Sequence, residues 1–143
     1  MEIRKAEIAD KQNVLHLLDE FREDCQNQMT GKKIVSKSAV TGGSQIYETL
    51  LNSQDYVIFL LIDKEHNAVG IITGYLCPML RSGKLRAEVE EFFIRKDFRE
   101  KGNSNMLMDA FFAWCKNKNV QKVNLESENG LNRAHGFYRK YGF

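Results

Sequence analysis

The chain has 143 residues, of which 43% are hydrophobic and 28% are charged, a composition that fits one compact domain better than two. Its formal net charge is +2 with both signs interspersed, so it lacks the strong single-sign field of nucleic-acid and membrane-surface proteins. We therefore expect a single domain over residues 1–143 that binds neither nucleic acid nor a membrane.

The cysteines and the first residues indicate the setting of the protein. Cys25, Cys77 and Cys115 are far apart and include no CxxC pair, which argues against a disulfide framework and against a zinc site. The N-terminal residues contain no apolar signal segment, and no later run approaches the length of a membrane span. We expect a cytoplasmic protein that uses no metal.

The N-terminal part of the chain predicts one strand and two helices. Residues 2–6 are typical of a short edge strand, and the apolar residues from Val14 to Cys25 recur at helical spacing. Residues 26–44 are polar and punctuated by glycine, which predicts a loop, either a solvated connection or a lid over an acceptor pocket. Ile46 and Leu50 then indicate a short second helix.

The middle of the chain predicts a sheet. Residues 56–62, 68–76 and 85–94 are apolar runs bounded by turn residues and indicate an antiparallel meander. A helix over residues 104–116, a strand through Val123 and Leu125, and a last helix that stops at Gly142 follow. The expected fold class is α/β (α+β), with a mixed central sheet that begins as a meander and is flanked by helices.

Three glutamates on the strand at residues 85–94 are candidates for a general base. Because side chains alternate along a strand, residues 88, 90, 92 and 94 should share one face and residues 89, 91 and 93 the other. A glutamate among apolar neighbours is costly to bury unless its pKa rises, and a raised pKa suits a general base. The alternative is that Glu88, Glu90 and Glu91 are solvated positions on the sheet face.

A charged turn, FREKGNS, leads from this strand into the next helix. Such a turn presents unpaired backbone amides at the positive end of the helix dipole, which suits a pyrophosphate. Arg95, Lys96, Arg99 and Lys101 could add charge-assisted contacts. The alternative is an ordinary solvated turn, and the chain contains neither GxGxxG nor GxxxxGK[ST].

Together with the end of the chain, this turn carries a resemblance to a known family. FREKGNS resembles the R/Q-x-x-G-x-G/A pyrophosphate loop of the GCN5-related N-acetyltransferase (GNAT) superfamily, with Ser104 where the family prefers Gly or Ala. NRAHGFYRKYGF is similar to its second motif, N-x-x-A-x-x-F-Y-x-x-x-G-F. The resemblance covers the whole chain and is strongest from Glu88 onward. It implies the GNAT fold, apparently without the usual C-terminal strands, and a homodimer that covers the bare edge.

The resemblance implies an enzyme that transfers the acetyl group of acetyl-CoA directly to a primary amine of a small molecule. A polyamine, an aminoglycoside or an amino-acid-like metabolite would fit. The alternatives are a non-catalytic acyl-CoA-binding or regulatory module and an enzyme that acetylates protein or peptide N-termini. The implied base is Glu90, followed by Glu91 and then Glu88, and Tyr138 would protonate the departing CoA thiolate.

The resemblance also implies which residues hold acetyl-CoA. The amide of Ile94 would polarise the thioester carbonyl, and Asn132 would contact the pantetheine arm. The residues expected at the cofactor are Phe93, Ile94, Arg99, Glu100, Lys101, Gly102, Asn103, Ser104, Asn105, Asn132 and Tyr138.

Overall fold

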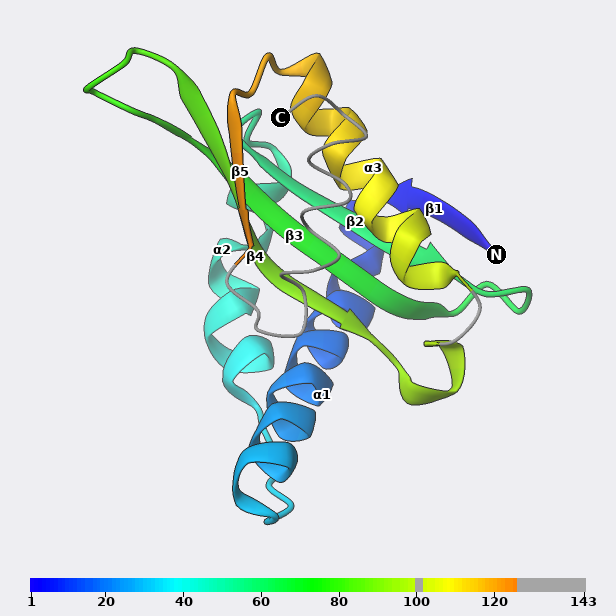
Figure 1. The fold of residues 1–143 in the computed structure, drawn as a ribbon. Helices are drawn as coiled ribbons and strands as arrows, with labels where there is room; N and C mark the ends of the chain where they lie inside the picture. The colour runs from blue at the N-terminus through cyan, green and yellow to red at the C-terminus, as the bar shows by residue number, and fades with distance from the viewer. Residues whose placement is uncertain (100–101, 126–143) are drawn as a thin grey trace.

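The structure is a computed structural model and describes residues 1–99 and 102–125 (Figure 1). A five-stranded sheet in the order β1-β2-β3-β4-β5 forms its centre. The first four strands pair antiparallel in sequence, and the last is parallel to its neighbour, so the sheet is mixed as expected. The strands are β1 (Glu2–Lys5), β2 (Tyr56–Ile62), β3 (Ala68–Pro78), β4 (Leu85–Ile94) and β5 (Lys122–Leu125).

Helices cover both faces of this sheet. Helix α1 (Lys11–Thr30) and helix α2 (Ser44–Leu51) lie on one face, and α3 (Asn103–Asn117) lies on the other (Figure 1). The predicted last helix, with Asn132 and Tyr138, lies outside the described residues. In the part of the chain that the structure describes, no helix has the length and apolar character needed to cross a bilayer.

The predicted loop over residues 26–44 is wrong at both ends. Helix α1 continues to Thr30, and Gly31 ends it in the left-handed conformation, φ +70°, with its amide donating to the Asn27 carbonyl at 2.9 Å. A π-helical turn, Ala39–Gly43, then leads directly into α2. The C-terminal end of α1 extends past the sheet (Figure 1). Because its last turns have no sheet to pack against, they have no apolar stripe from which a helix could be predicted.

A hydrophobic core fills each side of the sheet. Under α3, the side chains of Leu107, Phe111 and Phe112 are fully buried. Under α1 and α2, Leu17 packs against Leu60 of β2 and the neighbouring strands. Full burial of such side chains stabilises the fold by about 1.5–3 kcal/mol each, so the two cores fix the sheet between its helices.

A β-bulge interrupts β4 at Glu90. In the ladder between β3 and β4, Thr73 lies opposite Glu91, whereas the next residue, Gly74, lies opposite Val89. Glu90 is therefore an extra residue without a partner of its own on β3.

The bulge overturns the predicted alternation along β4. Val89 and Ile94 were expected on opposite faces, but both belong to the core under α3. Phe93 belongs to the core under α1 and α2. Because the extra residue shifts the alternation by one, Glu88 shares the face of Glu91 and not that of Ile94.

Candidate active site

Strands β4 and β5 are paired along the whole described length of β5. Their parallel pairing extends from Arg86 opposite Lys122 to Val89 opposite Leu125. Beyond the bulge, β4 continues to Ile94 and pairs there with β3 alone among the described residues. The second half of β4 therefore presents one free edge within the described structure.

The backbone of Ile94 faces this free edge. The Arg95 amide donates to the Val69 carbonyl of β3 at 2.9 Å, so in an antiparallel ladder the groups of Ile94 and Phe92 point the other way. The Ile94 carbonyl accepts a hydrogen bond from Arg99 Nε at 2.7 Å. The Ile94 amide is thus directed to the free edge of β4, and its contact with a thioester carbonyl stays a prediction.

The glycine turn lies just before α3. Gly102 has φ +73°, a conformation that strongly favours glycine, and it precedes the first turn of the helix. The Asn103 side chain is buried and donates to the Phe98 carbonyl at 2.8 Å, and Ser104 is also buried. Asn105 is exposed. At Asn103 and Ser104 this turn therefore offers backbone amides, not side chains, to an anion.

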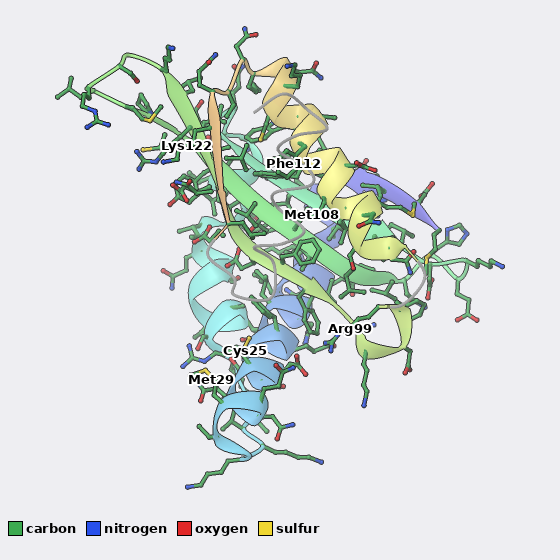
Figure 2. All side chains as sticks on the ribbon, in the orientation of Figure 1. Cys25, Met29, Arg99, Met108, Phe112 and Lys122 are labelled. Atoms are coloured by element: carbon green, nitrogen blue, oxygen red, sulfur yellow. The ribbon has the colours of Figure 1, made fainter. Side chains whose placement is uncertain are left out.

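The arginines of the turn are directed to α1. Arg95 forms two hydrogen bonds with the Glu20 carboxylate, at 2.7 and 2.8 Å. Arg99, labelled in Figure 2 near the end of β4, reaches Asp24 at 3.3 Å and stacks over the Phe93 ring, 5.6 Å from its centroid. Both guanidinium groups therefore connect the turn to α1. Contacts of Arg99 and Phe93 with a cofactor stay predictions.

Two adjacent carboxylates lie at the bulge, and each has a hydroxyl partner. Glu90 is exposed, and Tyr56 Oη donates to its Oε2 at 3.0 Å. The Glu91 amide donates to Thr73 Oγ1 at 3.0 Å, and the Thr73 hydroxyl donates to the Glu91 carboxylate. Burial raises the pKa of Glu91, and the neighbouring charge of Glu90 raises it further, although the Thr73 hydrogen bond lowers it.

The third candidate base has other partners. Glu88 Oε1 accepts hydrogen bonds from Arg86 Nε at 3.0 Å and from Asn124 Nδ2 of β5 at 2.8 Å. Glu88 therefore connects β4 and β5 where the two strands are paired. Sequence reasoning missed Tyr56 and Thr73 altogether, because both belong to strands whose register with β4 no local pattern shows.

The described residues also outline a pocket away from these groups. The volume of this pocket is about 330 Å³. It lies between the end of β1, the start of β2 and the end of α3, and Lys5, Trp114 and Lys118 line it. Tyr56, which donates to Glu90, also lines this pocket, but none of the predicted site residues does. Within residues 1–99 and 102–125, no three His, Cys, Asp or Glu side chains gather as a metal site would need.

Solved structures with the same fold cover nearly the whole chain. An acetyltransferase from Vibrio fischeri superposes with a TM-score of 0.71 at 19% identity, over 88% of this chain and 95% of its own. An aminoglycoside acetyltransferase from an uncultured soil metagenomic sample, in complex with sisomicin, gives 0.67 at 19% identity, over 98% and 86%. A ribosomal-protein-alanine N-acetyltransferase from Brucella melitensis biovar Abortus 2308 gives 0.65 at 17% identity, over 98% and 90%.

The sequence itself supplies the family. A comparison with curated proteins gives no significant match. The model of the acetyltransferase (GNAT) family, however, matches residues 16–143, from the first helix to the C-terminal motif. The chain therefore belongs to the acetyltransferase (GNAT) family and is an acetyltransferase, for which the family implies acetyl-CoA as the acyl donor.

Proposed function

We propose that this acetyltransferase transfers the acetyl group of acetyl-CoA to a primary amine of a small molecule. The observation that carries the proposal is the pair of carboxylates, Glu90 and Glu91, at the bulge of β4, next to its last described pair with β5. A cationic amine is attracted to such a pair, and no described Lys or Arg forms an ion pair with it. A polyamine, an aminoglycoside or an amino-acid-like metabolite has this chemistry.

The donor side of the site fits acetyl-CoA. The turn at Gly102 and the backbone amides of Asn103, Ser104 and Asn105 would hold the pyrophosphate, and the Ile94 amide would meet the thioester carbonyl. Bound acetyl-CoA supplies an activated acetyl thioester. The proposed contacts at Glu100, Lys101, Asn132 and Tyr138 lie outside the described residues, as does the proton donor role of Tyr138.

The acceptor side requires a base. An amine is protonated at neutral pH and must lose a proton before it can attack. Glu90 is the exposed member of the pair and would meet the amine, while Glu91 lies next to it and shares its electrostatic field. We therefore assign the base function to this pair of carboxylates, with Glu90 first and Glu91 second.

A thiol-release assay over a panel of amines tests this function. Wild type should turn over at least one small amine, and Glu90→Gln and Glu91→Gln should each lower kcat about 100-fold, the usual effect of losing a general base. Glu65→Gln, in the exposed turn before β3, is the matched control and should behave like wild type.

Two outcomes would contradict the proposal. The soil aminoglycoside acetyltransferase and the ribosomal-protein-alanine N-acetyltransferase share this fold, so the panel should include a peptide with N-terminal alanine. If that peptide outcompetes every free amine, the enzyme acetylates protein N-termini. If calorimetry detects acetyl-CoA binding and no acceptor is turned over, the domain is a non-catalytic acyl-CoA-binding module.

A further inference from the structure

We propose that Tyr56 and Thr73 are positioning residues for the carboxylate pair, with Tyr56 holding Glu90 and Thr73 holding Glu91, so that the acceptor amine meets two hydroxyl-anchored carboxylates. The inference rests on the proposed function for its catalytic meaning, but its geometry stands on the structure alone. Neither residue belongs to a motif, and they come from different strands, β2 and β3. Together they make the bulge on β4 part of a three-strand site.

Thr73 contacts Glu91 in two ways. Its Oγ1 accepts the Glu91 amide at 3.0 Å, and its hydroxyl donates to the Glu91 carboxylate. Thr73 itself is 1% exposed, so it cannot turn to solvent. A buried carboxylate without a donor is expensive, and this hydroxyl is the donor that the register of the bulge places opposite it.

Tyr56 reaches Glu90 across the sheet. The two residues are 34 positions apart in sequence, and the phenol donates to Glu90 Oε2 at 3.0 Å. Burial and the charges of Glu91 and Glu90 raise the pKa of Tyr56, so its hydroxyl keeps its proton at neutral pH. Tyr56 is therefore a hydrogen-bond donor to the pair and not a base in competition with it.

Most of the charged and titratable groups on the elements packed against this part of the sheet have partners of their own, and Glu23 is the exception among those named here. From α1, Glu20 and Asp24 pair with Arg95 and Arg99, and Asp19 is bound by backbone amides of residues 39 and 40. Glu23, also on α1, has a buried oxygen without a partner among the described residues. From α2, the Tyr47 hydroxyl donates to the Glu7 carbonyl, and on β4 itself Glu88 pairs with Arg86.

The consequence is a pair held by neutral hydroxyls. A cation such as lysine or arginine would neutralise Glu90 or Glu91 and compete with a charged acceptor. Hydroxyl donors fix the carboxylate geometry and leave the negative charge for the ammonium group of the acceptor.

The Thr73 contact is tested by two variants and two measurements. Thr73→Val keeps the shape and removes the hydroxyl, and Thr73→Ser restores it. Since the hydroxyl lowers the pKa of Glu91, Thr73→Val should move both the carboxyl ¹³C titration of Glu91 and the acid limb of the kcat/KM profile to higher pH. Thr73→Ser should return both toward wild type, which a purely structural role would not require.

The Tyr56 contact is tested by removing one oxygen. Tyr56→Phe should lower kcat about tenfold, the effect of losing one hydrogen bond to a charged group, and leave KM for acetyl-CoA unchanged. Tyr75→Phe is the matched control, because Tyr75 lies opposite Tyr56 on β3 and is partly exposed. It should leave kcat unchanged.

The outcomes separate this inference from the proposed function. If wild type acetylates amines while Tyr56→Phe and Thr73→Val match it in kcat and acid limb, the positioning roles are wrong and the function stands. If wild type turns over no amine, the proposed function is wrong, and the carboxyl ¹³C signals of Glu90 in Tyr56→Phe and of Glu91 in Thr73→Val decide the geometry alone. Unchanged signals would then overturn it.

Discussion

The two faces of the sheet are filled by side chains of different chemistry. Below the middle of α3 the core is apolar, with Phe111 and Phe112 in an edge-to-face contact at 6.1 Å between ring centroids, and Figure 2 labels Phe112 and Met108 where α3 lies over the sheet. The face under α1 and α2 also has an apolar core, but it encloses Thr73 and Asp19, which are buried and polar.

This difference separates stability from chemistry. Under the middle of α3, where the buried side chains are apolar, close packing decides which residues fit. On the other face, the buried Asp19 and Thr73 each have specific partners, and Thr73 links this set to the Glu91 carboxylate at the bulge. Substitutions on the two faces should therefore fail in different ways.

The largest effect is expected at Gly74, on the α3 face. A Cβ there would overlap the Phe111 ring and lie 2.5 Å from the Glu88 carbonyl oxygen. We expect Gly74→Ala to lower the free energy of unfolding by about 3 kcal/mol, the upper range for overpacking, as measured by urea denaturation. Gly42→Ala, where a Cβ meets open space, is the control and should change it by less than about 0.5 kcal/mol. Equal effects at both sites would show that α3 does not pack this closely on β3.

A smaller effect is expected at Asp19, on the opposite face. Its carboxylate accepts hydrogen bonds from Ser36 Oγ at 2.7 Å, from the Ala39 amide at 2.9 Å and from the Val40 amide at 3.2 Å. Asp19→Ala leaves these donors unpaired and should cost about 2 kcal/mol. Hydrogen exchange should accelerate at the Ala39 and Val40 amides.

Asp24→Ala is the matched control for this prediction. Asp24 lies on the same helix, but its ion pair with Arg99 is about one third exposed on each side, 35% and 35%. Its loss should cost less than about 1 kcal/mol and leave exchange at residues 39 and 40 unchanged. Unchanged exchange in Asp19→Ala would mean that other contacts hold this segment on α1.

The smallest effect has the opposite sign and depends on pH. The pKa of Glu91 is raised in the folded protein from its ordinary value of 4.5. Between 4.5 and the raised pKa, the folded protein therefore binds more protons than the unfolded chain. Wild type therefore loses stability as pH rises through this window, and Glu91→Gln does not have this loss. The free energy of unfolding of Glu91→Gln relative to wild type should rise with pH through the window and stay constant above it.

Urea denaturation over a pH range of about 4 to 8 measures this difference. Glu90→Gln offers an internal comparison, because the charge of Glu90 is one cause of the raised pKa of Glu91. Removing the charge of Glu90 should narrow the pH window in which the folded protein loses stability. A pH-independent difference between Glu91→Gln and wild type would contradict the buried, shifted carboxyl.

Much of the fold could be predicted from local patterns. The bounds of β2 and β4 agree with the predicted strands, because continuous apolar runs between turn residues have few other solutions. The last turns of α1 could not be predicted, because they pass the edge of the sheet and bury no apolar stripe. Strand β3 is two residues longer than the predicted 68–76 and ends at Pro78, which has no amide to donate.

The candidate site could be predicted only in part. The glycine turn at Gly102 and the strand end at Ile94 could be predicted because they are local features, and the roles of both residues at a cofactor stay predictions. The faces of β4 could not be predicted, because a bulge depends on the partner strand, here on Thr73 and Gly74. The hydroxyl partner Tyr56 was missed for the same reason, and the roles of the C-terminal motif stay predictions.

The bulge also has a consequence for comparing this chain with others. One extra residue in β4 shifts everything after it by one position relative to a strand with regular pairing. An alignment with a protein whose equivalent strand is regular needs a one-residue gap at Glu90, or it equates Glu91 with residues that point to the opposite face. For the same reason, deleting Glu90 would remove a carboxylate and make the ladder regular, while Phe93 and Ile94 would keep the faces they have now.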